Sequence, residues 1–436
     1  MKKNVAVVGY DNFNEKYLLE TIRDAEEICF VPVLDRNETA IQKQSYPFAE
    51  RLQLGLQRLN GISGGVEGII TFWDFPSSAL TPFLARDANL RYASVESVIK
   101  CEHKVWSREE QAAVVDTPKF APFYPFDDDP LGDVTLDFPF WVKPAVGHSS
   151  ILGFEIRNVE EFQDALEKIR SSIRTHTTPF RYVMENVDLP DRLAEKGASL
   201  CIAEEIISHG DQVTLEGYVQ DGEIFVYGVV DSLRLENEHS FSRYQYPSAL
   251  DEQTIARMKE KTAKIMRRFG YDNCPFNIEF FHDDSTGRID VVEVNSRVSQ
   301  SHADLFYKVD GQSNFQIPVD LALGRSPRWD SGMGEFAVAA KFFIRIFENG
   351  RSTSVPDAAS LGALERAMPD VRVDVKIAPG QLLADLPEQE SYSYEIADVF
   401  VGGRDEKELI EKFEASKDFL HFEFQPAGTS AKGIRP

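Results

Sequence analysis

The order of apolar and polar positions predicts alternating strands and helices in the first hundred residues. Asn4–Val8 is a short apolar run closed by Gly9, which is typical of a buried strand, and Asn14–Glu26 is typical of a helix. Two more strands are predicted at Ile28–Val33 and Glu67–Phe72. Strands that alternate with helices favour an open parallel α/β sheet. The first strand is followed by GYDNFN, so the GxGxxG fingerprint is absent and NAD binding is not expected.

The next part of the chain contains a strand, a loop and a capped helix. Phe138–Lys143 predicts a strand that runs into Pro144–Gly153, a loop rich in glycine and serine. Asn158 predicts the start of a helix through Ile169, with Glu161 completing a capping box. The segment 171–198 has no clear periodicity, and we expect a mobile insertion there.

Antiparallel strands are predicted further on. Strands are predicted at Leu200–Ile207 and Gln212–Gln220, and the dipeptide Asp221-Gly222 predicts a tight turn into a partner strand at Glu223–Asp231. The clearest helix is Asp251–Phe269, which lies between an aspartate N-cap and a glycine.

Beyond Arg325 the composition shifts to a mixture typical of an α+β unit. The tail Pro426–Pro436 has no apolar pattern, and we expect it to fray. The elements predicted between Arg325 and this tail are strands at Phe336–Phe347, Val371–Ile377, Glu395–Val401 and His421–Phe424, and a helix at Glu406–Phe419.

Composition excludes several classes of partner. The 436 residues carry a net charge of −24, from 47 basic and 71 acidic residues, so nucleic acid is not expected as a partner. A site for phosphates would therefore need its own lysines and arginines. No stretch approaches ~18 apolar residues, so we expect no membrane association. The four cysteines form no CxxC pair, and their low density is typical of the reducing cytoplasm, which we predict as the location.

The most informative segment is FNIEFFHDDSTGRIDVVEVNSR, residues 276–297. A turn centred near Thr286 pairs Glu279 with Glu293, Phe281 with Val291, and Asn277 with Asn295. Because strand side chains alternate with period two, both glutamates and both asparagines share one face. Like charges directly opposite each other destabilise a sheet unless a cation lies between them.

The chemistry of this face predicts a metal site. Magnesium prefers oxygen ligands, commonly one or two carboxylates together with substrate phosphates. Asn295 adds a neutral oxygen, and Arg297 provides a planar fork suited to phosphate or carboxylate. The alternative is a solvated hairpin with scattered acids. It is weakened by the apolar residues assigned to the other face, namely Phe276, Ile278, Phe280, Val292 and Val294.

Phosphate-binding groups are predicted in the loop after Lys143. The lysine ends a strand, and Pro144 cannot continue the ladder. Backbone N–H groups and hydroxyls of a glycine- and serine-rich loop cradle phosphates. The candidates in this loop are Gly147, His148, Ser149, Ser150 and Gly153. The P-loop pattern does not fit, because the lysine precedes the loop, and a plain surface loop remains the alternative.

Three weaker candidates complete the set. Glu204 and Glu205 end a strand before the turn at 209–211, where backbone groups and one acid would hold adenine and ribose; solvated glutamates are the alternative. Lys104 begins a helix of mixed charge, and an exposed lysine is its alternative.

Taken together, in this order and at these spacings, the motifs resemble the ATP-grasp superfamily over about residues 1–325. The resemblance implies that Lys104 and Lys143 contact the nucleotide and that GHSSILG, residues 147–153, is the lid over the phosphates. It implies that Glu279, Glu293 and Asn295 bind Mg²⁺ or Mn²⁺. It further implies that Arg297 meets the acyl-phosphate. The adenine and ribose contacts it implies are Glu204, Glu205, Ile207 and Asp211. The chain departs from the family pattern at Ser296, where proline is usual, and at Asp211, where glutamate is commoner.

The resemblance also implies the architecture, an α/β and α+β multidomain protein. A Rossmann-like domain is predicted at 1–103 and an ATP-grasp domain at 104–325, with two subdomains that clamp ATP. A C-terminal α+β cap at 326–425 makes the chain similar to the biotin-carboxylase-like and L-amino-acid ligase branch. No biotin-carrier motif is visible, which favours a stand-alone ligase.

The predicted function is ATP-dependent ligation of a carboxylate to an amine through an acyl-phosphate. The predicted partners are small-molecule carboxylate and amine substrates, with amino acids and a homodimer left open. His302, in the block that follows Arg297, is a candidate to accept the amine proton, with a structural role as the alternative. Two other functions stay open: phosphorylation of bicarbonate, and a nucleotide sensor without catalysis.

Overall fold

The computed structural model describes residues 2–39, 46–147, 152–194, 196–207, 210–235, 240–386, 389 and 392–426, without the side chains of residues 175 and 176. His148, Ser149 and Ser150, and the tail from residue 427 onward, lie outside the described residues. The chain forms two compact units. The first comprises residues 1–228, 250–300 and 314–329, and the second comprises 229–249, 301–313 and 330–436.

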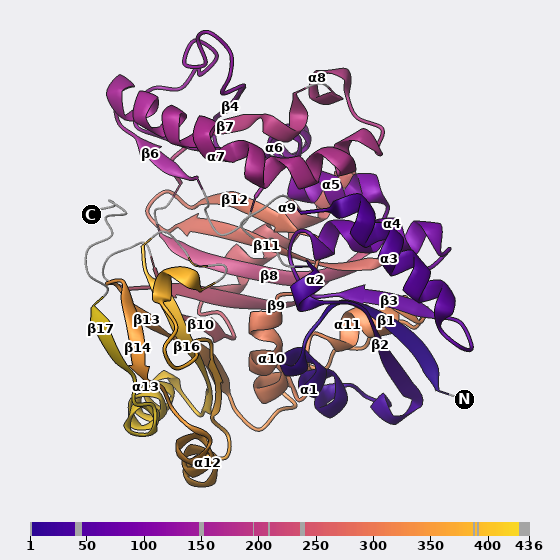
Figure 1. Cartoon of the computed structure of the whole chain (residues 1–436), viewed down its shortest axis with the longest axis vertical. Coiled ribbons are helices and arrows are strands. Elements are labelled where there is room, and N and C mark those ends of the chain that lie inside the picture. Colours follow the sequence, from indigo (N-terminus) through magenta and orange to yellow (C-terminus); the bar gives the residue numbers. More distant parts are fainter. Residues whose placement is uncertain are drawn as a thin grey trace. The chain divides into compact units, whose positions relative to one another are not determined.

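The first unit begins with a parallel sheet in the order β2-β1-β3 (Figure 1). The open parallel α/β arrangement predicted for this region is confirmed. Its strands are β1 (Lys3–Tyr10), β2 (Ile28–Asp35) and β3 (Gly68–Thr71). Its helices are α1 (Asn12–Thr21), α2 (Arg36–Thr39), α3 (Phe48–Gly61), α4 (Ser77–Asp87) and α5 (Val95–Glu102).

A second sheet of this unit is antiparallel, in the order β4-β7-β5-β6. Its strands are β4 (Phe120–Phe123), β5 (Phe140–Pro144), β6 (Phe154–Ile156) and β7 (Cys201–Glu205). The accompanying helices are α6 (Lys104–Ala112), α7 (Val159–Glu185) and α8 (Asp191–Ala194).

Helix α7 is much longer than the sequence predicted. Asn158 caps it as expected, but the helix continues to Glu185, so the helix end predicted at Ile169 is wrong; the mobility expected for 171–198 stays a prediction. Ile173, Phe180 and Met184 are buried at helical spacing. Polar residues separate these apolar positions along the chain, and Pro179 lies inside the helix, so the helical periodicity beyond Ile169 is weak in the sequence.

The third sheet region of the first unit carries the predicted carboxylate hairpin. Its strands run in the order β12-β11-β8-β9, and β9 continues into the second unit. Helix α9 begins after the N-cap Asp251 and ends at Gly270, as predicted; Gly270 has a positive φ of 66°, which favours glycine. The elements are β8 (Asp211–Gln220), β9 (Glu223–Arg234), β11 (Cys274–Asp283), β12 (Arg288–Asn295), α9 (Glu252–Phe269) and α11 (Gln316–Ala322).

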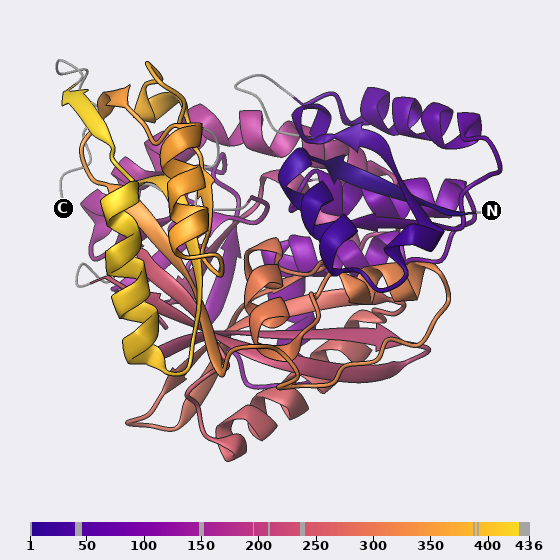
Figure 2. The same ribbon diagram turned by 90° about the horizontal axis from the view of Figure 1, so that it is seen from below.

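The second unit is α+β, as the C-terminal composition predicted. Its main strands follow β9 in the order β10-β13-β16-β15. Leu364 of α12 and Leu409 of α13 pack with Phe342 and Val399 of this sheet, and Figure 2 shows these helices in orange and yellow beside their strands. The elements are β10 (Phe241–Tyr246), β13 (Val338–Ile346), β14 (Gly350–Ser354), β15 (Arg372–Val375), β16 (Tyr394–Gly403), β17 (Glu423–Pro426), α10 (Ala303–Asp310), α12 (Ala358–Ala367) and α13 (Glu406–Ser416).

The domains predicted from the sequence divide the chain into more parts than the two units. The boundary predicted between residues 103 and 104 lies inside the first unit. That three-domain scheme stays a prediction. Within the described part of the chain, every helix is too short or too polar to cross a membrane.

Candidate active site

The centre of the candidate site is the hairpin of β11 and β12. Glu279 pairs with Glu293 and Asn277 pairs with Asn295, as the sequence predicted. The prediction that Phe281 faces Val291 is wrong, because a bulge after Glu279 shifts the register and Phe280 pairs with Val291. The bulge also leaves Val292 only half-buried, while Val291 is buried.

Two acidic side chains therefore face each other at the half-buried centre of the site. Loss of solvent raises the pKa of Glu279 to about 7, and the nearby charge of Glu293 acts in the same direction. Gln212 of β8 donates a hydrogen bond to Glu279 over 3.1 Å. Gln212 is not a candidate that the sequence reveals, because its nearness to Glu279 depends on the pairing of β8 with β11.

Asn295 is oriented by its cross-strand neighbour. The amide nitrogen of Asn277 donates to the carbonyl oxygen of Arg297 at 3.0 Å, so the amide oxygen of Asn277 is left to accept from the amide nitrogen of Asn295 at 2.9 Å. This chain of bonds directs the Asn295 oxygen away from Asn277. Two carboxylates and one amide oxygen then form a donor set that suits a hard divalent cation.

Lys104 joins this hairpin to the predicted phosphate loop. It is the first residue of α6, and its Nζ lies 3.8 Å from an oxygen of Glu293. The same Nζ donates to the carbonyl oxygen of Gly147 over 2.5 Å. The structure thus brings together a lysine, a metal-ligand candidate and the start of the loop, which are far apart in the sequence.

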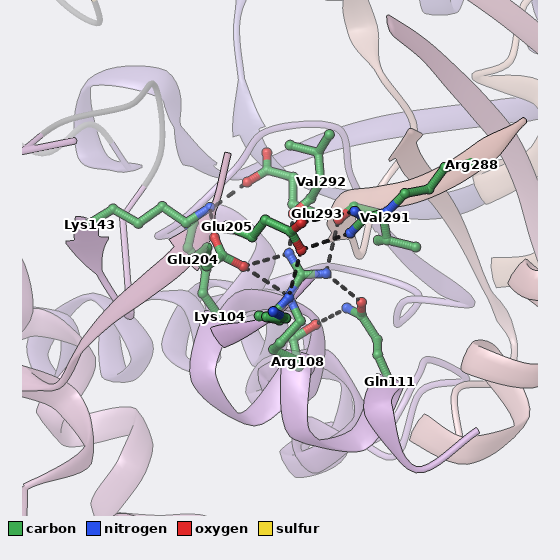
Figure 3. Close-up of polar contacts among 12 residues, drawn as sticks. Lys104, Arg108, Gln111, Lys143, Glu204, Glu205, Arg288, Val291, Val292 and Glu293 are labelled. Atoms are coloured by element: carbon green, nitrogen blue, oxygen red, sulfur yellow. Dashed lines mark hydrogen bonds and ion pairs between the residues drawn. The ribbon is translucent and has the colours of Figure 1, made fainter. Parts of the chain in front are cut away.

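Lys143 meets a different acid, Glu204. Its Nζ lies 2.6 Å from one oxygen of Glu204, and the guanidinium of Arg108 binds the other at 2.6 and 2.8 Å (Figure 3). Burial would raise the pKa of Glu204, but the two cations outweigh it and hold that pKa at about 2. Glu204 is therefore a buried anion paired with two cations, not a solvated glutamate.

Arg108 is a central residue that the sequence analysis missed. It is buried, and it also donates to Gln111 and to the carbonyl oxygen of Val291, over 3.0 and 2.9 Å. Arg108 thus connects α6, the end of β7 and the bulged strand β12. Its spacing of four residues from Lys104, which puts both on one face of α6, was the available signal.

Glu205 points into a separate ion pair. Arg288 binds both of its oxygens, at 3.0 and 2.9 Å, and the backbone N–H of Lys119 donates to it at 3.1 Å. The bond from Arg288 lowers the pKa of Glu205 to about 2. Its side chain is thus committed to this pair, and only its backbone is left for an adenine contact. Ile207 is half-buried, and its adenine role stays a prediction.

Arg297 lies beside Asp74, which follows β3. Its Nε and Nη2 bind one oxygen of Asp74, at 2.6 and 2.5 Å. Asp304, an acid close to Arg297 in the sequence, is instead bonded to Lys308 within the second unit. Glu102 accepts a bond of 3.2 Å from Ser296, and burial together with the charge of Asp74 raises the pKa of Glu102 to about 7.

Two further predicted site residues have neighbours of their own. Asp211 pairs with His282 on β11, and strand alternation puts both on the face opposite Glu279. His302 belongs to the second unit, where its buried ring packs edge-on against Tyr244 and Phe306. The ribose role of Asp211 and the proton-accepting role of His302 stay predictions.

Comparisons with known proteins agree with this geometry. Residues 136–303 match the family model described as ATP-grasp domain. A stretch of 75 residues is 35% identical to the carbamoyl phosphate synthase large chain of Xylella fastidiosa, but it spans only 17% of this chain and 7% of that protein.

Solved structures are similar over almost the whole chain. The L-amino acid ligase from Bacillus licheniformis has a TM-score of 0.71 and 18% identity, covering 97% of this chain and 99% of that one. Biotin carboxylase from Campylobacter jejuni has a TM-score of 0.65 and 14% identity, covering 97% and 92%. At these identities the likeness shows the fold.

Proposed function

We propose that this chain, whose residues 136–303 match the ATP-grasp domain model, is an ATP-dependent ligase that joins a carboxylate to an amine. In this reaction a carboxylate oxygen attacks the γ-phosphorus of ATP, ADP leaves, and an acyl-phosphate forms. The amine nitrogen then attacks the acyl carbon, phosphate leaves, and the nitrogen loses a proton. The net result is one new carbon–nitrogen bond for each ATP consumed.

The observation that carries the proposal is the facing pair Glu279 and Glu293, with Asn295 turned toward the same face. The pair is unfavourable by itself, because like charges that face each other across a sheet repel, and a divalent cation would offset that cost. Glu279, Glu293 and Asn295 would hold a magnesium ion there, and its charge would offset the negative charge of the phosphates.

The cations around the pair are proposed to hold ATP and the carboxylate. Lys104, between Glu293 and Gly147, would contact the phosphate chain, and Lys143 would do so from the end of β5. Arg297, kept in place by Asp74, would orient the carboxylate and stabilise the oxyanion of the tetrahedral intermediate. Exclusion of water is assigned to the loop 147–153, whose residues His148, Ser149 and Ser150 lie outside the described part.

The substrate class is tested by a phosphate-release screen over pairs of amino acids, followed by mass spectrometry of the products. The proposal expects phosphate release that depends on both substrates and a product whose mass equals their sum minus water. Glu293→Gln should release no phosphate, whereas Glu223→Gln, at an exposed acid of β9, should behave as the unaltered protein.

The same screen separates the alternatives. ATP hydrolysis that requires bicarbonate and gives no amide would replace the proposal with a biotin-carboxylase-like reaction. ATP binding without turnover, for every carboxylate tried, would instead indicate a nucleotide sensor.

A further inference from the structure

A second group of metal-ligand side chains lies on the opposite face of the hairpin sheet. Asp211 begins β8, His282 is its partner on β11, and Asp284 follows in the hairpin turn. One ligand atom from each of these three residues lies within 4.8 Å of the others. Atoms that share an ion, each about 2.0–2.4 Å from it, lie no farther apart than this.

The imidazole of His282 gives independent evidence for a ligand. The residue is 5% exposed, and its Nδ1 is buried without a hydrogen bond, although an oxygen of Asp284 lies 3.1 Å away. Buried polar atoms are normally hydrogen-bonded, so this arrangement is costly as it stands. A cation that accepted the lone pairs of both atoms would satisfy the nitrogen and explain the short approach.

The charges of the group balance with a divalent ion. Two carboxylates and a neutral imidazole sum to −2, which one divalent cation cancels. A protonated imidazole would leave a net charge of −1. A nearby acid, Asp251, is not available as a further ligand, because its oxygens already cap α9 through Gln253 and Thr254.

The backbone is shaped to bring Asp211 to this histidine. Gly210 has a φ of 90°, and a Cβ at this position would lie 2.0 Å from the carbonyl oxygen of His282. Only glycine allows so close an approach. The chain therefore crosses directly over His282 before it enters β8.

We propose that Asp211, His282 and Asp284 bind a divalent transition-metal cation. A mixed set of imidazole and carboxylate ligands suits Zn²⁺ and its neighbours better than Mg²⁺. The bound ion ties the start of β8 to the turn between β11 and β12. It is separate from the magnesium at Glu279 and Glu293, because the two ligand sets face opposite sides of the sheet.

The test measures zinc binding in a protein that lacks the proposed magnesium site. Glu293→Gln is stripped with a chelator and titrated with Zn²⁺ by calorimetry, alone and combined with Asp284→Asn, Asp211→Asn or His282→Gln. Asp284 is 79% exposed, so its substitution does not threaten folding. Asp221→Asn, at the other end of β8, is the matched control.

We expect one zinc per chain in the Glu293→Gln protein and in the Asp221→Asn control. The Asp284→Asn and Asp211→Asn changes should each lower the zinc affinity at least about tenfold. Even the loss of a residue that only hydrogen-bonds to a metal ligand lowers metal affinity about 10–100-fold. Absence of zinc binding, or equal affinity in Asp284→Asn and the control, would overturn the proposal. A raised KM for ATP when Asp211→Asn is made in the otherwise unaltered protein, with unchanged zinc affinity in the Glu293→Gln protein, would return Asp211 to the ribose role and also overturn the proposal.

Discussion

Repulsion between Glu279 and Glu293 has a measurable consequence at the scale of single residues. The substitution Glu293→Gln removes one of the facing charges, so we expect turnover to be lost while the thermal midpoint without magnesium stays equal or rises. Calorimetry in the presence of a chelator, with Glu223→Gln beside it, checks the stability. A variant with normal magnesium-dependent turnover would contradict the metal assignment.

Arg297 offers a test of geometry rather than charge. Lysine keeps the positive charge but loses the planar fork that binds Asp74 and, in our proposal, the substrate carboxylate. We expect Arg297→Lys to lower turnover about 10²–10³-fold, the usual effect of losing an oxyanion donor, with ATP affinity nearly unchanged. Loss of ATP affinity with intact turnover at saturation would assign Arg297 to the nucleotide instead.

The pair of Glu205 with Arg288 predicts a pH dependence of stability. The pKa of Glu205 is lowered from 4.5 to about 2, so this pair stabilises the fold above pH 4.5 and ceases to do so as pH falls toward 2. Glu205→Gln should therefore lower the free energy of unfolding most near neutral pH and progressively less toward pH 3. The effect is about 1 kcal/mol or less, because the carboxylate is a third exposed.

Urea unfolding of Glu205→Gln and of the unaltered protein, measured from pH 7 down to pH 3, checks the sign. A difference between the two proteins that stays constant over this range would show that the pair does not lower this pKa.

At the scale of elements, the start of α7 depends on one capping residue. The side chain of Asn158 accepts from the backbone N–H of Glu161 at 3.0 Å, and Glu161 accepts from the N–H of Arg157. Asn158→Ala should weaken this end of the helix by about 1 kcal/mol, whereas Asn158→Asp keeps the cap. Hydrogen exchange in the first turn should then be about fivefold faster in the alanine variant alone.

The charge of the whole molecule makes nucleotide binding depend on the site's own cations. At a net charge of −24, ATP is repelled except where lysines and a divalent ion offset it. ATP at one hundred times its Kd, with magnesium, should stabilise the protein by about 2.7 kcal/mol. ATP without magnesium should stabilise the protein much less, and so should ATP added to the Glu293→Gln variant with or without magnesium. Urea titrations can measure these differences. Equal stabilisation by ATP with and without magnesium would argue against a metal-assisted site.

The local pattern of the sequence was enough to predict the parallel α/β sheet at the start of the chain and the facing pairs of the candidate site. Alternation along 276–297 fixes which residues share a face, and a short turn fixes the register near it, so the facing pairs at Glu279 and Asn277 could be predicted. Capping residues at Asn158 and Asp251 likewise act within one turn of helix. The order of the motifs then indicated the family.

Only the tertiary structure decided which distant side chains neutralise one another. Arg108 beside Glu204, Asp74 beside Arg297 and Gln212 beside Glu279 join elements between 67 and 223 residues apart, and no spacing along the chain records such contacts. The bulge after Glu279 and the helical continuation of α7 to Glu185 follow from packing that outweighs local preference. The local pattern thus specified the facing pairs of the hairpin, and the packing of separate elements determined the ion pairs around them.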